Sequence, residues 1–80
     1  MKKQKSVEVW TGFKFDQDWH ETNDALIALA EKMGGEHGDS GAGFGIRDIC
    51  FTFKNAELAK EFMVLAKKKF KSKTLTASIS

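Results

Sequence analysis

The residues that most suggest chemistry lie together in the middle of the chain, where His37 stands among Glu36, Asp39 and Ser40. Such a group could hold a metal ion or pair a nucleophile with a base. Both kinds of site need side chains fixed in space, and neighbours in a glycine-rich segment are not fixed. Cys50 has no flanking histidine and no second cysteine, so we expect an inert thiol in a reducing cytoplasm. The sequence predicts no catalytic residue, no metal site and no enzymatic activity.

Six of the seven glycines lie between Gly34 and Gly45 and could form a phosphate cradle. A P-loop needs a lysine directly after its last glycine, and none follows here. Gly41, Gly43 and Gly45 precede an expected strand, whereas a dinucleotide-binding loop leads from a strand into a helix. We therefore expect no nucleotide cofactor. Residues 41–45 are interpreted as a strand with one bare face, in preference to a mobile loop. Either would let the backbone of another protein approach closely.

Charges are unevenly distributed over the 80 residues, although the formal net charge is only +2. Residues 8–48 carry nine acidic and three basic side chains, whereas residues 49–80 carry two acidic and seven basic ones. The length and the 41% hydrophobic content predict one domain over 1–80, with a flexible basic segment at 1–6. No apolar run approaches the roughly 20 residues that cross a bilayer, so no membrane association is expected.

Two kinds of periodicity predict the elements that position these residues. Alternating apolar residues indicate strands, and apolar residues three and four positions apart indicate amphipathic helices. Asp18 and Glu21 are expected to form a capping box, and Asn55 to cap a second helix. A glycine pair is expected to end the first helix. The expected elements are strands at 7–15, 41–45, 49–53 and 75–79, helices at 18–33 and 55–70, and a turn near Gly45-Ile46.

Each expected element has one apolar side, and these sides together form the expected core. Trp10, Asp48 and Cys50 fall on the opposite face of the sheet. The expected core residues are Val7, Val9, Thr11, Phe13, Phe15, Trp19, Thr22, Leu26, Leu29, Ala30, Met33, Ile49, Phe51, Phe53, Leu58, Phe62, Leu65, Ala66, Phe70, Leu75, Ala77 and Ile79.

The order β-α-β-β-α-β predicts an α+β fold, in which a four-stranded antiparallel sheet carries both helices on one face. This arrangement resembles the ferredoxin-like α/β plait. Residues Val9–Phe13 and Phe51–Glu57 resemble, in addition, the RNA-recognition motif domain, in which exposed aromatic side chains stack on bases. Trp10 matches the aromatic position of the first strand. Asp48 and Cys50 occupy the third-strand positions, so the resemblance implies the topology and not the RNA contacts.

The favoured function is a small, non-enzymatic protein-binding module. Stand-alone plaits of this size are similar to phage-encoded inhibitors of host enzymes or defence complexes, anti-CRISPR proteins among them. That similarity implies steric docking on a partner in the host cytoplasm. Trp10 is the expected anchor, because an exposed tryptophan is frequent at the centre of protein interfaces. The other expected partner-binding residues are Asp16, Asp18, Asp24, His37, Asp39, Phe44, Arg47 and Asp48.

Two alternatives stay open at this point. A single-stranded nucleic-acid binder would use Trp10 and clusters of basic residues, and its affinity would fall steeply with salt. Its expected contacts are Lys2, Lys3, Lys5, Lys67, Lys68, Lys71 and Lys73. A homodimeric structural or ligand-sensing plait would instead cover Trp10 by stacking two sheets, so we expect either a monomer or a homodimer.

Overall fold

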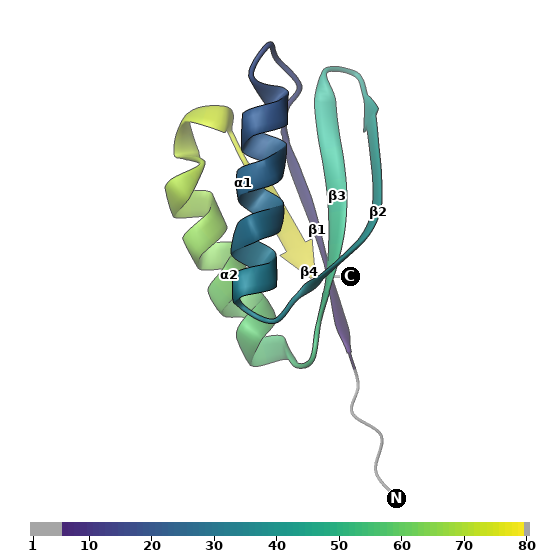
Figure 1. Cartoon of the computed structure of the whole chain (residues 1–80), viewed down its shortest axis with the longest axis vertical. Coiled ribbons are helices and arrows are strands. Elements are labelled where there is room, and N and C mark those ends of the chain that lie inside the picture. Colours follow the sequence, from purple (N-terminus) through teal and green to yellow (C-terminus); the bar gives the residue numbers. More distant parts are fainter. Residues whose placement is uncertain (1–5, 80) are drawn as a thin grey trace, which may run out of the picture.

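The computed structural model describes residues 6–79, which follow the expected β-α-β-β-α-β order (Figure 1). The elements are β1 (Val7–Lys14), α1 (Trp19–Lys32), β2 (Glu36–Gly43), β3 (Ile46–Phe53), α2 (Ala56–Lys69), the short 3-10 helix η1 (Lys71–Lys73) and β4 (Thr76–Ile79). Apart from Ser6, the expected flexible segment 1–6 lies outside the described residues, and so do Lys2, Lys3 and Lys5. Between residues 6 and 79, no helix has the length and apolar character that a membrane crossing requires.

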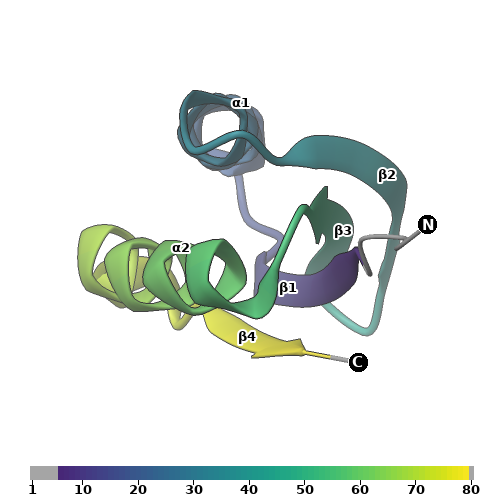
Figure 2. The same cartoon turned by 90° about the horizontal axis from the view of Figure 1, so that it is seen from below.

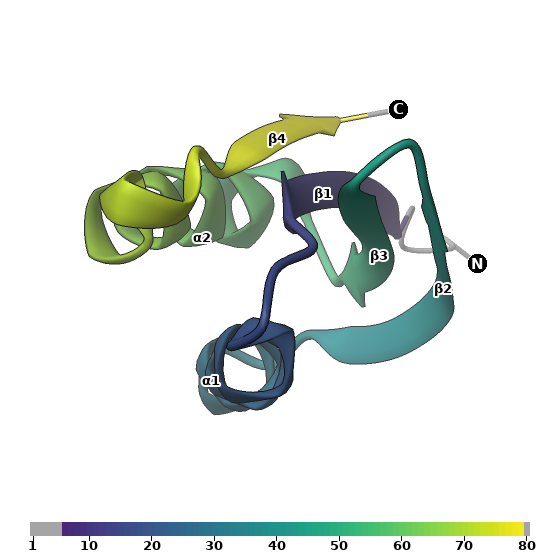
Figure 3. The same ribbon diagram turned by 90° about the horizontal axis from the view of Figure 1, so that it is seen from above.

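All four strands pair antiparallel in the order β2-β3-β1-β4, so β1 and β3 are central and β2 and β4 are the two edges. Both helices lie on one side of this sheet (Figure 2). Seen from the other end, α1 lies on the side of β2, and α2 lies on the side of β4 (Figure 3). The expected ferredoxin-like α/β plait is confirmed.

The core fills the space between the helices and the sheet. Phe62 of α2 packs on Phe51 and Phe53 of β3, with ring centroids 5.3 and 5.0 Å apart. Thr11 is buried among apolar side chains, and its hydroxyl donates a hydrogen bond to the carbonyl oxygen of Ile49 at 2.9 Å. This bond replaces the water that the hydroxyl loses on burial. The buried apolar cluster consists of Val9, Phe13, Leu26, Ala30, Ile49, Phe51, Phe53, Ala59, Phe62, Ala66, Phe70 and Leu75.

The helix ends agree with the sequence in two of three cases. The amide of Leu58 donates to the side chain of Asn55 at 2.9 Å, which confirms the cap of α2. Gly34 ends α1 with a φ of +86°, which glycine adopts without strain. The capping box at Asp18 is wrong. Asp18 precedes α1, but its side chain accepts no capping bond and lies 3.8 Å from the ammonium of Lys73.

Three expected core residues lie at the surface instead. Phe15 follows the end of β1, is 41% exposed and packs beside the ring of Trp19. Leu65 is 45% exposed, because at 3.6 residues per turn it points about 100° away from the line through Ala59, Phe62 and Ala66. Ile79 is exposed at the end of the edge strand β4.

The glycine-rich segment is a strand, as favoured, but it is longer than expected. β2 begins at Glu36 and pairs with β3 as far as Gly43, with an irregularity in register between His37 and Ser40. The turn falls at Phe44-Gly45. The five residues from Glu36 to Ser40 show no alternation of apolar side chains, so no periodicity indicated that they would join the sheet.

Candidate protein-binding surface

The sheet face that the helices leave uncovered is termed the open face. Trp10 of β1 and Ile46 of β3 both point to this side and are 37% and 42% exposed. Its members are Glu8, Trp10, Gly12 and Lys14 of β1, Glu36, Gly41 and Gly43 of β2, Ile46, Asp48, Cys50 and Thr52 of β3, and Thr76 and Ser78 of β4. Polar and apolar groups are mixed here, as in the interfaces of many protein complexes.

Gly12 is buried in the middle of the open face beneath the side chains of its neighbours. A Cβ atom added at this position would lie 3.0 Å from Oδ1 of Asp48, 3.2 Å from Oγ1 of Thr76 and 3.3 Å from Cγ2 of Ile46. Side chains of β3 and β4 therefore come together above one bare backbone position on β1. The ladder between β1 and β3 runs through Gly12 without a shift in register.

The tip of the β2–β3 hairpin carries Phe44, which is fully exposed. Phe44 and Gly45 have φ values of 53° and 77°, and two positive φ values in a two-residue turn are typical of type I′. Asn, Asp and Gly are the usual residues of this turn, whereas a bulky residue there is an outlier. Phe44 thus adopts a disfavoured backbone conformation, and its ring gains no burial.

Arg47 lies on the helix side of β3 rather than on the open face. Its guanidinium stands 5.0 Å from the ring centroid of Trp19, and its Nε donates to Oδ1 of Asn23 at 3.1 Å. A second, longer contact of 3.4 Å joins it to Oγ of Ser40. These contacts tie β2, β3 and the start of α1 together. The arginine expected to contact a partner is therefore held by the fold.

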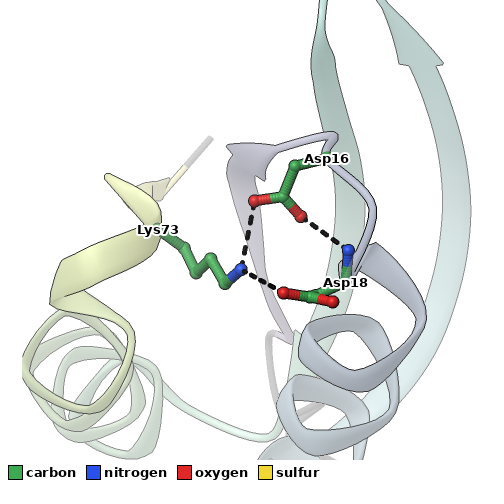
Figure 4. A network of polar contacts seen from close by, with 3 residues as sticks. All are labelled: Asp16, Asp18 and Lys73. Carbon is green, nitrogen blue, oxygen red and sulfur yellow. Dashed lines mark hydrogen bonds and ion pairs between the residues drawn. The ribbon is translucent and has the colours of Figure 1, made fainter.

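Asp16 and Asp18, which were predicted to bind a partner, form ion pairs with Lys73, which was predicted to contact nucleic acid (Figure 4). Lys73 of η1 donates to Oδ2 of Asp16 at 3.1 Å, and Oδ1 of Asp16 accepts the amide of Asp18 at 3.0 Å. The hydrogen bond from Lys73, followed by that from Asp18, holds the pKa of Asp16 below its ordinary value. Because Lys73 is paired in this way, its charge is less available to a phosphate.

The remaining predicted residues are dispersed. Asp24 is exposed on α1, and Lys67, Lys68 and Lys71 are exposed where α2 leads into η1. Asp48 is exposed on the open face. Asp39 lies in the irregular part of β2, and the ring of His37 is 5.9 Å from that of Phe51. Of the predicted residues, Trp10 and Asp48 therefore share the open face, and Phe44 stands at the hairpin tip.

Cys50 lies on the open face but is buried there. Burial raises the pKa of its thiol, and the nearby carboxylates of Glu8 and Asp39 raise it further. The thiol is thus protonated and shielded, which fits the expected inert cysteine. Within the described part of the chain, no three side chains of the metal-ligating types lie close enough to hold an ion.

Ile46 is an exposed apolar residue of the open face that sequence reasoning missed. It extends by one more step the alternation of Cys50 and Asp48 along β3. This signal is present in the sequence, but the turn expected near Gly45-Ile46 leaves Ile46 out of the strand.

Comparisons with known proteins inform the fold alone. No protein-family model matches the chain, and no curated protein matches it. Among solved structures it is similar to the de novo designed protein Foldit4, with a TM-score of 0.63 and 8% identity over 94% of this chain and 91% of the other. It is also similar to the de novo designed protein Ferredog-Diesel, with a TM-score of 0.57 and 10% identity over 100% of this chain and 88% of the other. At such low identity these neighbours support the plait and carry no statement about function.

Proposed function

We propose that the protein is a non-enzymatic binding module that docks on another protein through its open face and the tip of the β2–β3 hairpin. The observation that carries the proposal is Phe44, a large apolar side chain that is fully exposed on a backbone of positive φ.

An L-residue in the left-handed region costs about 1–2 kcal/mol, which Asn or Gly would reduce or avoid. No intramolecular burial offsets this cost at Phe44. Unfavourable backbone conformations of this kind cluster at functional sites. A ring held at the tip of a hairpin fits a pocket on a partner, and aromatic anchors of this type dominate interface energies.

Trp10 and Ile46 extend the same surface over the sheet. Together with Phe44 they give a docking area with three large apolar side chains, bordered by Asp48 and Glu8. Docking of this kind would act by occupying a site on a larger complex. We therefore extend the proposal to a steric inhibitor of an enzyme or defence complex, of the phage-encoded type.

The test is affinity capture from a bacterial lysate, with and without nuclease, using the wild type and three variants. Phe44→Asn removes the ring and suits the turn, and Trp10→Thr removes the indole and suits a strand. Val64→Ser is the matched control, because Val64 is 65% exposed on α2, on the helix side of the sheet.

A protein band that survives nuclease, weakens by about tenfold or more with Phe44→Asn or Trp10→Thr, and persists with Val64→Ser supports the proposal. Bands that vanish with nuclease beside recovered RNA or DNA would favour the single-stranded nucleic-acid binder, for which the exposed Trp10, Lys67, Lys68 and Lys71 would supply the contacts. A sedimentation experiment that shows only a Trp10-dependent dimer would favour the homodimeric plait.

A further inference from the structure

Trp10 presents part of its ring to solvent on the open face, in the central strand β1. It is 37% exposed, and the residues that pair with it are small, Cys50 of β3 on one side and Ser78 of β4 on the other. A tryptophan ring that reaches solvent between small neighbours can stack against a flat group of another molecule. The charges around the ring decide which group that would be.

Acidic side chains stand on both sides of Trp10 along β1. Glu8 is exposed and precedes it by two residues on the same face. Gly12 follows it by two residues, and a Cβ atom on Gly12 would lie 3.0 Å from Oδ1 of Asp48. Alternate residues of a strand lie about 6.8 Å apart, so the carboxylate of Asp48 lies over β1 about one such step from Trp10. The indole is thus placed between Glu8 and the carboxylate of Asp48.

A third carboxylate acts on the same part of the open face. Burial raises the pKa of Cys50, and the charges of Glu8 and then Asp39 raise it further. Because Cys50 stands opposite Trp10, both of these charges are felt beside the indole. Among residues 6–79 both ion pairs are formed by Lys73, so no basic side chain of this part of the chain neutralises the three carboxylates by direct contact.

The charge of the open face is opposite in sign to that of the whole chain. Lys14 is its one basic member, and it pairs with Ile46 at the hairpin end of β1, four residues from Trp10. The formal net charge of the chain is +2, whereas the face is net negative. A surface of this kind favours a partner surface of positive charge. The charged members of the face are Glu8, Lys14, Glu36 and Asp48.

An arginine side chain suits both the ring and the charges. Its guanidinium is planar and cationic, is attracted to a tryptophan face within about 6 Å of the ring centroid, and has several N–H donors for carboxylates. The helix side of this chain has such a contact already, with Arg47 at 5.0 Å from the ring centroid of Trp19. The compact ammonium of lysine cannot stack in this way. The carboxylates would repel a nucleic-acid phosphate, and two stacked open faces would bring surfaces of the same net charge together.

We propose that the open face binds an arginine side chain of the partner protein, stacked on the indole of Trp10 between Glu8 and Asp48. This proposal rests on the proposed protein-binding function and adds to it the chemistry of the partner's contact surface, which is basic and exposes arginine. The apolar residues of the docking surface contribute buried area, and the arginine contact contributes the selection by charge.

The test uses acetylated and amidated peptides with the full protein. SGRGRGS carries arginine, SGKGKGS carries lysine, and a third peptide has citrulline, the uncharged isostere of arginine, in place of both arginines. Binding is followed by NMR through the indole N–H signals of the two tryptophans. Trp19, whose ring lies beside Arg47 on the helix side, is the internal control for Trp10. Single-stranded octathymidylate is titrated in parallel.

Three variants that each remove one carboxylate charge locate the contact. Glu8→Gln and Asp48→Asn remove a charge from the open face at nearly constant size. Glu61→Gln removes the same charge from an exposed position on α2, on the helix side of the sheet. All three residues are exposed, so none of these changes is expected to affect folding. The circular dichroism of each variant verifies this.

SGRGRGS is expected to shift the Trp10 signal at millimolar concentration and to leave the Trp19 signal in place. The citrulline peptide should bind about fivefold more weakly or less, and SGKGKGS should lie between the two. Glu8→Gln and Asp48→Asn should each weaken the binding of SGRGRGS about threefold, and Glu61→Gln should leave it unchanged.

Four results would overturn the proposal. They are binding of the citrulline or lysine peptide as tight as that of SGRGRGS, equal effects of the three variants, no shift of Trp10 at about ten millimolar SGRGRGS, and tighter binding of octathymidylate than of SGRGRGS. The proposed function would survive such a result if Phe44→Asn still weakened capture of the partner from the lysate. It would fail separately if Phe44→Asn and Trp10→Thr had no effect on that capture.

Discussion

β1 and β2 are both eight-residue strands that flank β3, yet the fold constrains them very differently. In β1, Val9 and Phe13 are buried, and even Gly12 has neighbours within 3.0–3.3 Å of the position of a Cβ atom. In β2 every residue is exposed, and Gly41 and Gly43 have open space around them. The comparison shows that the glycine of β1 is packed against its neighbours, whereas Gly41 and Gly43 of β2 have no packing role.

The largest expected effect is the difference in folding stability between replacing a packed glycine and replacing a glycine with open space around it. Gly35 joins α1 to β2, and a Cβ atom there would lie 2.6 Å from Cε2 of Phe53, whose ring is buried. We expect Gly35→Ala to lower the free energy of unfolding by about 2–3 kcal/mol, because the core must shift to admit the methyl group. Gly41→Ala should change it by about 0.5 kcal/mol or less. Urea denaturation of both variants measures the difference, and equal values would contradict the comparison.

The next expected effect is an increase in folding stability. Phe44→Asn should raise the free energy of unfolding by about 1 kcal/mol, because Asn tolerates the positive φ of the turn and the ring loses no buried contacts. The measurement is the urea midpoint, with Val64→Ser as the control for removing an exposed apolar side chain. A destabilised Phe44→Asn would show that the ring supports the fold, which would remove the main argument for the docking surface.

The smallest effect concerns acid stability at the end of β1. The lowered pKa of Asp16 stabilises the folded state above the unfolded pKa of 3.8, and this contribution is lost as the pH falls through the lower folded pKa. We expect the urea midpoint of the wild type to fall more steeply below about pH 4 than that of Lys73→Met. Lys71→Met, an exposed lysine of the same 3-10 helix, serves as the control. Identical pH profiles for Lys73→Met and the wild type would show that the ion pair does not form in solution.

The contrast between the buried strand β1 and the exposed strand β2 also explains how much of the fold could be predicted from the sequence. β1, β3 and both helices follow from periodicity, because the apolar residues of each element face one core. Glu36–Ser40 could not be assigned in this way, since that part of β2 is held by the backbone ladder to β3 and buries no side chain. Leu65 was misplaced because it lies beside the buried line of α2, not on it.

The candidate surface was predicted in part. Trp10 and Asp48 lie on the open face, and strand parity was sufficient to place both. The pairing of Lys73 with Asp16 could not be foreseen, because it joins residues far apart in sequence through the short helix η1. The contacts of Arg47 with Asn23 and Trp19 likewise depend on how α1 crosses the sheet.

The pairing of β4 with β1 has a consequence for the order of folding. Val9, near the start of the chain, pairs with Ile79, so one edge of the central strand β1 stays unpaired until β4 has been synthesised. The β2–β3 hairpin, whose closing pair is Gly43 and Ile46, can form locally and early. A nascent chain that stalls before β4 would thus expose two strand edges at once, the free edge of β2 and that of β1. Such chains are prone to aggregate.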